Sequence, residues 1–309
     1  MTRRSMPCAT PGSLLRRRFP TSAAGPCARI MTTLSAMSHT GQRPAPLAVG
    51  IDLGGTWLRL VALRDGHVVR GAHRAIPLSK LSKFLPTRSG GGRIASLVVA
   101  SRGVWTPAER RAARRRLRGA AARVEVISDA EAALLGALDA QPGVLVLAGT
   151  GSIVLGRDAG GRLARAGGLG PLLGDEGSAF WLGREWLRVT ATTARARALA
   201  RHPDAVARVA ALAPRVLARA RRGDRRARAI VAAGQAELAA LAVDVIRRLG
   251  LRAPVRVSWS GGLLGHAWYR AGVQRALARR IACRWTAPAA DAALAAARLA
   301  ARRAPRGGR

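Results

Sequence analysis

The stretch AVGIDLGGTWLRLVALRDGH, residues 48–67, contains two apolar runs separated by a glycine-rich turn. We expect strands at Ala48–Asp52 and Trp57–Arg64, because both runs are apolar and bounded by turn residues. Asp65-Gly66 is typical of a two-residue hairpin turn, so a third strand should begin at His67. The ordered part of the chain therefore opens with a three-stranded meander.

Strand and helix patterns alternate after this meander. A linker of Ser, Lys, Pro and Gly comes first, and Thr106-Pro107 is typical of a helix start. The expected elements are a strand at Ile94–Ala100, a helix from Thr106, a strand at Val124–Ser128, and a helix from Asp129 to about Leu138. The first half thus has the order βββαβα.

The same order begins again after the break at Gln141-Pro142-Gly143. We expect strands at 144–148, 153–157 and from 163, a helical insert at about 178–249, a strand at 255–259, a helix at 269–280, a strand at 281–284 and a closing helix from 288. Such a duplication predicts two α/β domains, 47–141 and 142–309, facing one another across a cleft, with the last helix packing back on the first domain.

Residues 1–46 differ in composition from the rest. They hold seven arginines and no acidic residue, with scattered Pro, Ser, Thr and Gly, and we expect a disordered basic extension. The composition is similar to that of an organellar transit peptide. A reading frame extended upstream of a start at Met31 or Met37 explains it equally, and we favour that explanation.

The 309 residues carry a formal net charge of +37, yet only Lys80 and Lys83 among the 53 basic residues are lysines. This bias is typical of a GC-rich genome. The arginines are spread over nearly every expected helix, without one stripe of interleaved aromatic residues, which argues against specific nucleic-acid binding. The three cysteines suggest neither a disulfide framework nor a metal site, and we expect a cytoplasmic protein without a membrane span.

The turn after the first strand, Gly54-Gly55-Thr56, is suited to bind phosphate. Its glycines let backbone N–H groups face an anion, and Thr56 adds a hydroxyl group. Asp52, at the end of a buried strand, can hold a hydrated Mg²⁺ ion beside phosphate oxygens. The alternative is a glycine-rich hairpin turn that Asp52 merely caps.

Two further turns fit a nucleotide. Gly149-Thr150-Gly151-Ser152 occupies the equivalent turn of the second half, so the two loops could hold the triphosphate of ATP from both sides. Ser260-Gly261-Gly262 leaves a strand and enters a helix, where absent side chains allow a planar ring to lie against the backbone. A plain strand-to-helix connection is its alternative.

Asp129 is the candidate catalytic base. It follows the strand Val124–Ser128 at the end where the cleft should lie, and could accept the proton of a substrate hydroxyl group. As the first residue of a helix it could equally be a simple N-cap.

The segment GGLGPLLGDEGS, residues 167–178, is dense in glycine and holds an adjacent acidic pair. Asp175 could accept hydrogen bonds from sugar hydroxyl groups or cap the following helix. Glu176 could supplement the metal shell or favour the helix N-terminus through the macrodipole.

Taken in order, these motifs resemble the BadF/BadG/BcrA/BcrD-type ATPase family and, within it, the eukaryotic-type N-acetylglucosamine kinases. The resemblance spans about Ala48–Ala301 and is most specific at Gly174-Asp-Glu-Gly-Ser-Ala-Phe-Trp181. It implies a ribonuclease-H-like, two-domain (actin-like) kinase that uses ATP and Mg²⁺ on a small sugar, and it leaves a homodimer open. The implied roles are Asp129 as base, Thr56 and Thr150 at the phosphates, Gly261 and Gly262 at adenosine, and Gly168 with Asp175 at the amino sugar.

The chain departs from this family in its sugar pocket. Leu169 stands where sugar-binding members usually carry an aromatic residue, which removes a flat apolar surface for a sugar ring. Ser101-Arg102-Gly103 stands where a small Ser/Gly turn is expected, so a cation enters the expected pocket beside Ser101. A rival function therefore stays open, in which the protein is a nucleotide-dependent regulator or sensor without sugar turnover.

Overall fold

The computed structural model describes residues 46–54, 57–65, 67–85 and 94–304. The expectation for residues 1–46 lies outside these residues apart from Pro46. The first half contains β1 (Leu47–Leu53), β2 (Trp57–Arg64), β3 (His67–Arg74), α2 (Leu78–Phe84), β4 (Ile94–Ser101), α3 (Pro107–Arg116), β5 (Arg123–Ser128) and α4 (Asp129–Ala137).

The second half repeats this plan around a larger set of helices. Its elements are β6 (Gly143–Ala148), β7 (Ser152–Arg157), β8 (Leu163–Gly167), α5 (Gly170–Leu173), α6 (Ala179–Thr190), α7 (Thr193–Ala200), α8 (Ala205–Ala210), α9 (Ala213–Arg221), α10 (Arg225–Leu249), β9 (Val255–Ser260), α11 (Gly262–Gly265), α12 (Ala267–Ala278), β10 (Cys283–Trp285) and α13 (Ala292–Arg303).

Each half forms one mixed, five-stranded sheet. The strand orders are β3-β2-β1-β4-β5 and β8-β7-β6-β9-β10, so the two sheets have the same topology. In each, a central strand pairs antiparallel with the next strand and parallel with the fourth. The predicted fold class, two ribonuclease-H-like α/β units, is confirmed.

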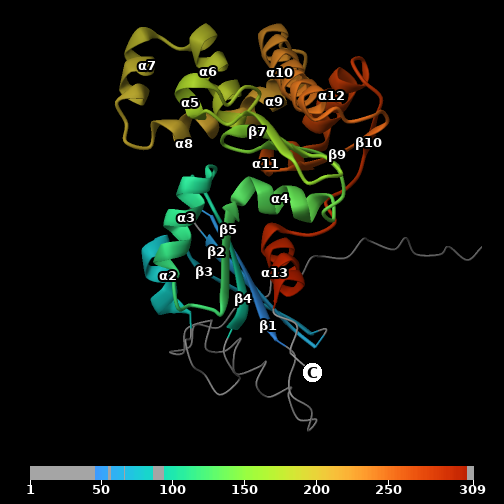
Figure 1. Cartoon of the computed structure of the whole chain (residues 1–309). Helices are drawn as coiled ribbons and strands as arrows, with labels where there is room; N and C mark the ends of the chain where they lie inside the picture. Colours follow the sequence, from blue (N-terminus) through green and yellow to red (C-terminus); the bar gives the residue numbers. More distant parts are fainter. Residues whose placement is uncertain (1–45, 55–56, 66, 86–93, 305–309) are drawn as a thin grey trace, which may run out of the picture.

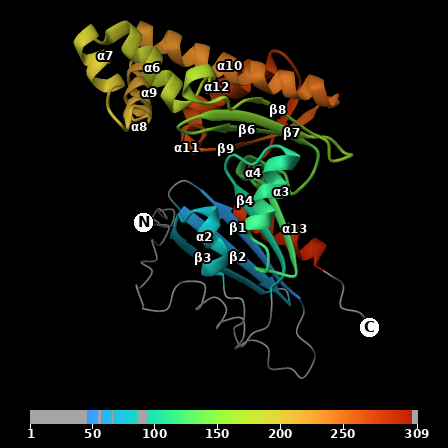
Figure 2. The same ribbon diagram turned by 60° about the vertical axis from the view of Figure 1, so that its left-hand side comes forward.

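Helices cover both faces of the first sheet (Figures 1 and 2). Alternation along β1 sends Leu47, Val49 and Ile51 toward α2 and α3, and sends Ala48 toward α13. The second sheet buries one face under α6, α9, α10 and α12. Its other face packs on α4, which therefore lies between the two sheets.

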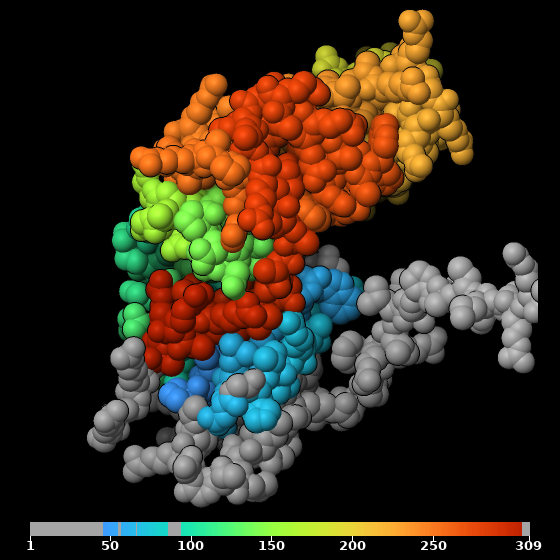
Figure 3. Space-filling model, turned by 90° about the vertical axis from the view of Figure 1, so that its right-hand side faces the viewer, coloured from blue at the N-terminus to red at the C-terminus, as the bar shows by residue number. Residues whose placement is uncertain are grey.

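The last helix, α13, follows the second sheet in sequence but packs on the first. Figure 3 shows it in red against the blue residues of the first sheet. Its backbone comes so close to β1 that a Cβ atom placed on Gly50 would lie 2.1 Å from the backbone nitrogen of Ala297. The alanine-rich sequence of α13 allows this approach, since Ala293, Ala296, Ala297 and Ala300 are all buried.

Two predicted boundaries were wrong. The linker expected before Ile94 contains α2, which forms because Leu81 is fully buried under the first sheet. The closing helix begins at Ala292 instead of Pro288, because the side chain of Asp291 accepts a hydrogen bond from the backbone of Leu294 and caps the helix there.

Helix α10 is the one described helix long and apolar enough, by length and composition, to cross a membrane. In the fold it is a core helix: Val231, Leu238, Val245 and Ile246 are buried against the second sheet and its neighbouring helices. Its apolar composition is therefore explained by packing.

We predict that Gly50→Ala destabilises the protein by at least about 2 kcal/mol, because the new methyl group would overlap the backbone of α13, which cannot rotate away. Urea unfolding followed by circular dichroism measures the loss. Gly265→Ala is the control, since nothing lies within 4 Å of the position of its added Cβ atom. Equal stability of the two variants would contradict the close contact.

Candidate functional site

A cavity of about 540 Å³ lies where the two halves meet, within the range of about 300–1,000 Å³ common for small-molecule sites. It brings together residues from five separate parts of the chain. Its lining includes Asp52, Arg59, Asp129, Leu147, Ser260 and the start of α13 at Ala290, Asp291 and Ala292. Two predicted site residues, Asp52 and Asp129, therefore share one cleft.

Asp52 lies near the C-terminal end of β1, directly across the hairpin from Arg59. A guanidinium nitrogen of Arg59 lies 3.2 Å from a carboxylate oxygen of Asp52, whose side chain is 14% exposed. Burial raises the pKa of the Asp52 carboxyl group, and the charges of Asp129 and Asp291 raise it further against the opposing effect of Arg59. The cleft thus carries an excess of negative charge at this point.

Asp129 begins α4 but does not cap it, so the N-cap interpretation was wrong. The hydroxyl group of Ser128 takes that role and accepts a hydrogen bond from the backbone nitrogen of Glu131 at 3.0 Å. One carboxylate oxygen of Asp129 accepts from the backbone of Ala130 at 2.8 Å. The other oxygen has no hydrogen-bond partner among the described residues and can accept a proton.

Asp291 is a third carboxylate of the cleft, and the sequence reasoning missed it. It caps α13 and pairs with Arg70 of β3. A signal was available: Asp291 follows the fifth strand of the second sheet at a helix start, as Asp129 does in the first. The duplication therefore places one carboxylate from each repeat in the same cleft.

The second phosphate loop, Gly149–Ser152, is held by the start of α6. Backbone nitrogens of Ala179 and Phe180 donate to the carbonyl oxygens of Gly149 and Thr150 at 2.9 and 3.0 Å. The hydroxyl group of Ser152 donates to the carbonyl oxygen of Glu176 at 2.7 Å. These bonds fix the loop against the segment that contains the acidic pair.

Asp175 points into this loop, so its interpretation as a helix cap was also wrong. Ser178 caps α6, whereas Asp175 accepts from the backbone nitrogen of Ser152 at 3.2 Å and is 7% exposed. A Cβ atom on Gly151 would lie 2.8 Å from the carboxylate of Asp175, so only glycine fits there. Burial raises the pKa of Asp175 and the charge of Glu176 adds to this, while the bond from Ser152 lowers it.

Tyr269 holds the segment that contains the acidic pair through a hydrogen bond. Its hydroxyl group is fully buried and donates to the carbonyl oxygen of Gly177 at 2.8 Å. Burial raises the pKa of this hydroxyl group well above its usual value, so it remains a donor. Gly177 itself packs on the backbone of Gly234, where a Cβ atom would overlap an oxygen at 2.3 Å.

The residues predicted to line a sugar pocket adjoin this segment in part. Gly168 adopts a positive φ of 70° and lies against Ile153. Leu169 is 63% exposed, although it is apolar, and it contacts Gly174. Ser101 is buried at the end of β4, in register with Ser128 of β5 and Leu53 of β1.

The predicted adenosine loop lies against the second phosphate loop. Gly261 has a φ of 94°, and a Cβ atom on it would lie 2.3 Å from the carbonyl oxygen of Ala148. Gly262 opens the short helix α11, and its backbone nitrogen is within 4 Å of a Cβ position on Gly149. In the first phosphate loop, the nitrogen of Gly54 donates to Trp57 at 3.0 Å, while Gly55 and Thr56 lie outside the described residues.

The residues around Asp52 fit a magnesium ion that is shared with phosphate. The charges of Asp129 and Asp291 both raise the pKa of Asp52, and a cation bound at Asp52 would offset their repulsion. Mg²⁺ commonly takes one or two carboxylates and completes its shell with water and phosphate oxygens. Glu176 has a buried carboxylate oxygen without a hydrogen-bond partner, but it is not among the residues that line this cleft. Among the described residues, no group of three His, Cys, Asp or Glu side chains could hold a metal by itself.

The chain resembles proteins of known family. Residues 99–297 match the profile of the BadF/BadG/BcrA/BcrD ATPase family. A short stretch of 61 residues is 48% identical to an N-acetylmuramic acid/N-acetylglucosamine kinase of Clostridium acetobutylicum. That alignment covers 20% of this chain and 20% of the relative.

Solved structures share the fold over most of the chain. A candidate N-acetylglucosamine kinase from Chromobacterium violaceum superposes with a TM-score of 0.58 and 25% identity, covering 82% of this chain and 98% of its own. A ROK family glucokinase from Streptomyces griseus, in complex with glucose and AMPPNP, has a TM-score of 0.56, 17% identity and coverages of 83% and 99%. The second of these supports the fold alone.

We predict that Asp52→Asn raises the midpoint of thermal unfolding at pH 7 without added metal. The folded state raises the pKa of this carboxyl group above its usual value of 3.8, so its contribution to stability is complete below that pH and is lost as the pH rises through the folded pKa. The stability gap between the variant and the natural protein should narrow as the pH falls toward 4.

Asp139→Asn is the matched control, because Asp139 is exposed on the turn after α4 and pairs with Arg298 outside the cleft. If Asp52→Asn and Asp139→Asn behaved alike across this pH range, the burial of Asp52 would not govern its titration.

Proposed function

Because this chain belongs to the BadF/BadG/BcrA/BcrD ATPase family, we propose that it transfers the γ-phosphoryl group of ATP to a hydroxyl group of an amino sugar such as N-acetylglucosamine or glucosamine. The observation that carries the proposal is the position of Asp129. Ser128 caps α4 in its place, and the Asp129 side chain lines the same cleft as Asp52 and Ser260.

The proposed reaction needs one proton acceptor. The sugar hydroxyl oxygen attacks the γ-phosphorus, the bond from that phosphorus to the oxygen shared with the β-phosphate breaks, and ADP leaves. The hydroxyl proton passes to the free carboxylate oxygen of Asp129. In the second glycine loop, the backbone N–H groups of Thr150 and Gly151 have no acceptor among the described residues, and in the proposed reaction they donate to the phosphates and stabilise their charge.

Asp52 is the residue proposed to hold Mg²⁺, which supplies positive charge to the phosphate oxygens when bound. In its 3.2 Å ion pair with Arg59, the Arg59 side chain is 55% exposed, so the guanidinium group can turn to solvent when Asp52 binds a cation. Nothing lies within 4 Å of a Cβ position on Gly262, which supports its proposed contact with adenosine, and Gly261 allows the turn to approach Ala148 closely enough to place it there.

The acceptor side of the proposal rests on the segment from Gly168 to Glu176. Asp175 keeps one carboxylate oxygen beyond its bond to Ser152 and can accept from sugar hydroxyl groups. Leu169 offers an exposed apolar surface for an acyl group, though not a flat one for a ring. The rival, a nucleotide-dependent sensor, needs only the nucleotide side.

Asp129→Asn should lower the rate of phosphoryl transfer by roughly 100- to 10,000-fold, since asparagine cannot accept the proton, while ATP binding stays within a factor of a few. A coupled assay of ADP release measures the rate of transfer, and calorimetry with a non-hydrolysable ATP analogue measures ATP binding. Asp139→Asn serves as control and should keep full activity. If Asp129→Asn kept its turnover, Asp129 would not be the catalytic base.

A panel of sugars distinguishes kinase from sensor. We expect ADP release by the full chain with MgATP to rise at least about tenfold with one of glucosamine, N-acetylglucosamine, N-acetylmannosamine and N-acetylmuramic acid, because substrate binding completes the site. Glucose tests whether the amino group matters. Slow hydrolysis that ignores every sugar, with intact ATP binding, would instead support the sensor.

A further inference from the structure

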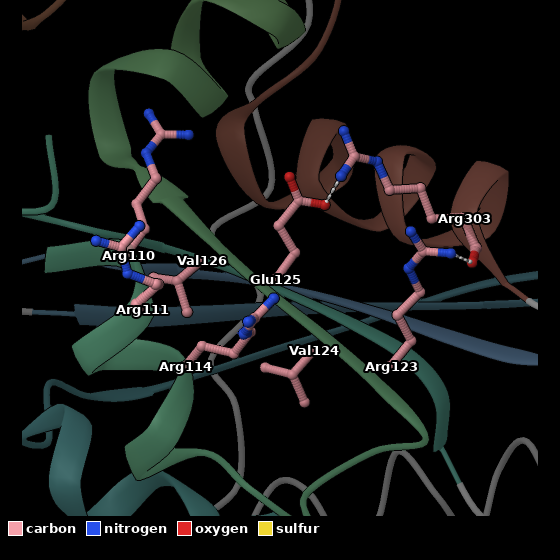
Figure 4. Close-up of a pocket in the computed structure, with 8 residues that line it drawn as sticks. All are labelled: Arg110, Arg111, Arg114, Arg123, Val124, Glu125, Val126 and Arg303. Carbon is pink, nitrogen blue, oxygen red and sulfur yellow. Dashed lines mark hydrogen bonds and ion pairs between the residues drawn. The ribbon is translucent and has the colours of Figure 1, made fainter. Parts of the chain in front are cut away.

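A groove lined by arginines lies at the edge of the first sheet, away from the residues of the cleft. It runs between α3 and the edge strand β5 and is closed by the end of α13. Figure 4 shows its lining: arginines of α3 on one side, Arg123 and Arg303 on the other, and Val124 and Val126 between them. The arginines are Arg110, Arg111, Arg114, Arg123 and Arg303.

The negative charges of the carboxylates near this groove do not neutralise all of its arginines. Glu125 pairs with Arg303, and Glu131 pairs with Arg110 at 2.6 Å. Among the described residues, Arg111, Arg114 and Arg123 form no ion pair, and Arg123 donates only to the carbonyl oxygen of Arg303 at 3.4 Å. Three guanidinium groups therefore surround the cavity with donors to spare and repel one another.

The site is built from three elements, which distinguishes it from a solvated helix face. The arginines of α3 recur at helical spacing, and the stripe continues through Arg115 and Arg118 beside a second hollow. The strand supplies Arg123 and the last helix supplies Arg303, so residues far apart in sequence converge on one cavity. In the sequence the arginines are spread over nearly every helix, so this convergence becomes visible only in the fold.

Size and chemistry select the ligand class. The cavity of about 230 Å³ equals the liquid volume of roughly eight water molecules, enough for a phosphate group with a small organic part. Planar guanidinium groups bind phosphate oxygens through paired hydrogen bonds. The lining contains no aromatic residue on which a base could stack, which disfavours single-stranded nucleic acid.

We propose that this groove is a second anion site, which binds a small molecule or headgroup carrying a phosphate group. The phosphate lies between Arg111 and Arg114 of α3 and Arg123 of β5, and the half-buried Val124 contacts the organic part. The proposal does not depend on the proposed sugar kinase activity, because none of these residues lines the cleft.

The experiment compares the natural full chain with three double variants at 150 mM salt. Arg111→Ala/Arg114→Ala removes two unpaired guanidinium groups from the groove. Arg221→Ala/Arg222→Ala removes the same charge from an exposed region at the end of α9. Calorimetry measures binding of inorganic phosphate and glycerol 3-phosphate. Sedimentation measures binding to phosphatidylcholine vesicles with and without phosphatidic acid.

We expect the groove variant to lose at least tenfold in affinity for a soluble probe or for the phosphatidic acid vesicles, while the control variant binds like the natural protein. The probe that is lost identifies the source of the phosphate. The affinity of Arg111→Lys/Arg114→Lys, which keeps the charge but not the paired donors, should lie between those of the groove variant and the natural protein. Equal binding by all variants would overturn the proposal and assign any affinity to net charge. Circular dichroism verifies that each variant is folded.

Discussion

The close contact between α13 and β1 is the constraint on which the arrangement of the two halves depends. Without a side chain at Gly50, the backbone of the last helix reaches the central strand of the first sheet. Gly136 of α4 makes a second such approach, since its Cβ atom would lie 2.7 Å from the carbonyl oxygen of Ala290. The chain thereby returns from the second sheet to the first, where α13 packs beside α4, the helix that lies between the two sheets.

This packing brings the start of each helix to the same place. Asp129 opens α4 and Asp291 caps α13, and both lie near Asp52 at the end of β1. In a chain with 53 basic and 16 acidic residues, three carboxylates gathered in one cleft are a local reversal of charge. Burial of Asp52, whose side chain is 14% exposed, strengthens the effect of the neighbouring charges on it, which suits a site that takes a cation together with phosphate.

Much of the fold was predictable because it depends on local pattern. The alternation of apolar runs, the hairpin signal at Asp65 and the break at Pro142 placed nearly every strand within two residues. What the sequence could not settle depends on neighbours distant in the chain. Whether Ser128 or Asp129 caps α4 is decided by side-chain geometry, and the orientation of Asp175 toward Ser152 requires the loop to pack on its segment. Helix α2 forms because Leu81 is buried against the first sheet, whose strands lie elsewhere in the chain.

The edges of the two sheets share a feature that concerns solubility. All four edge strands carry arginine: β3 at Arg70 and Arg74, β5 at Arg123, β8 at Arg165 and β10 at Arg284. An edge strand offers unpaired backbone groups to any other strand, which makes it a starting point for aggregation. When two copies approach edge to edge, like charges meet and separate them. The arginines on the edge strands therefore disfavour edge-to-edge association of two copies, during folding and in concentrated solution.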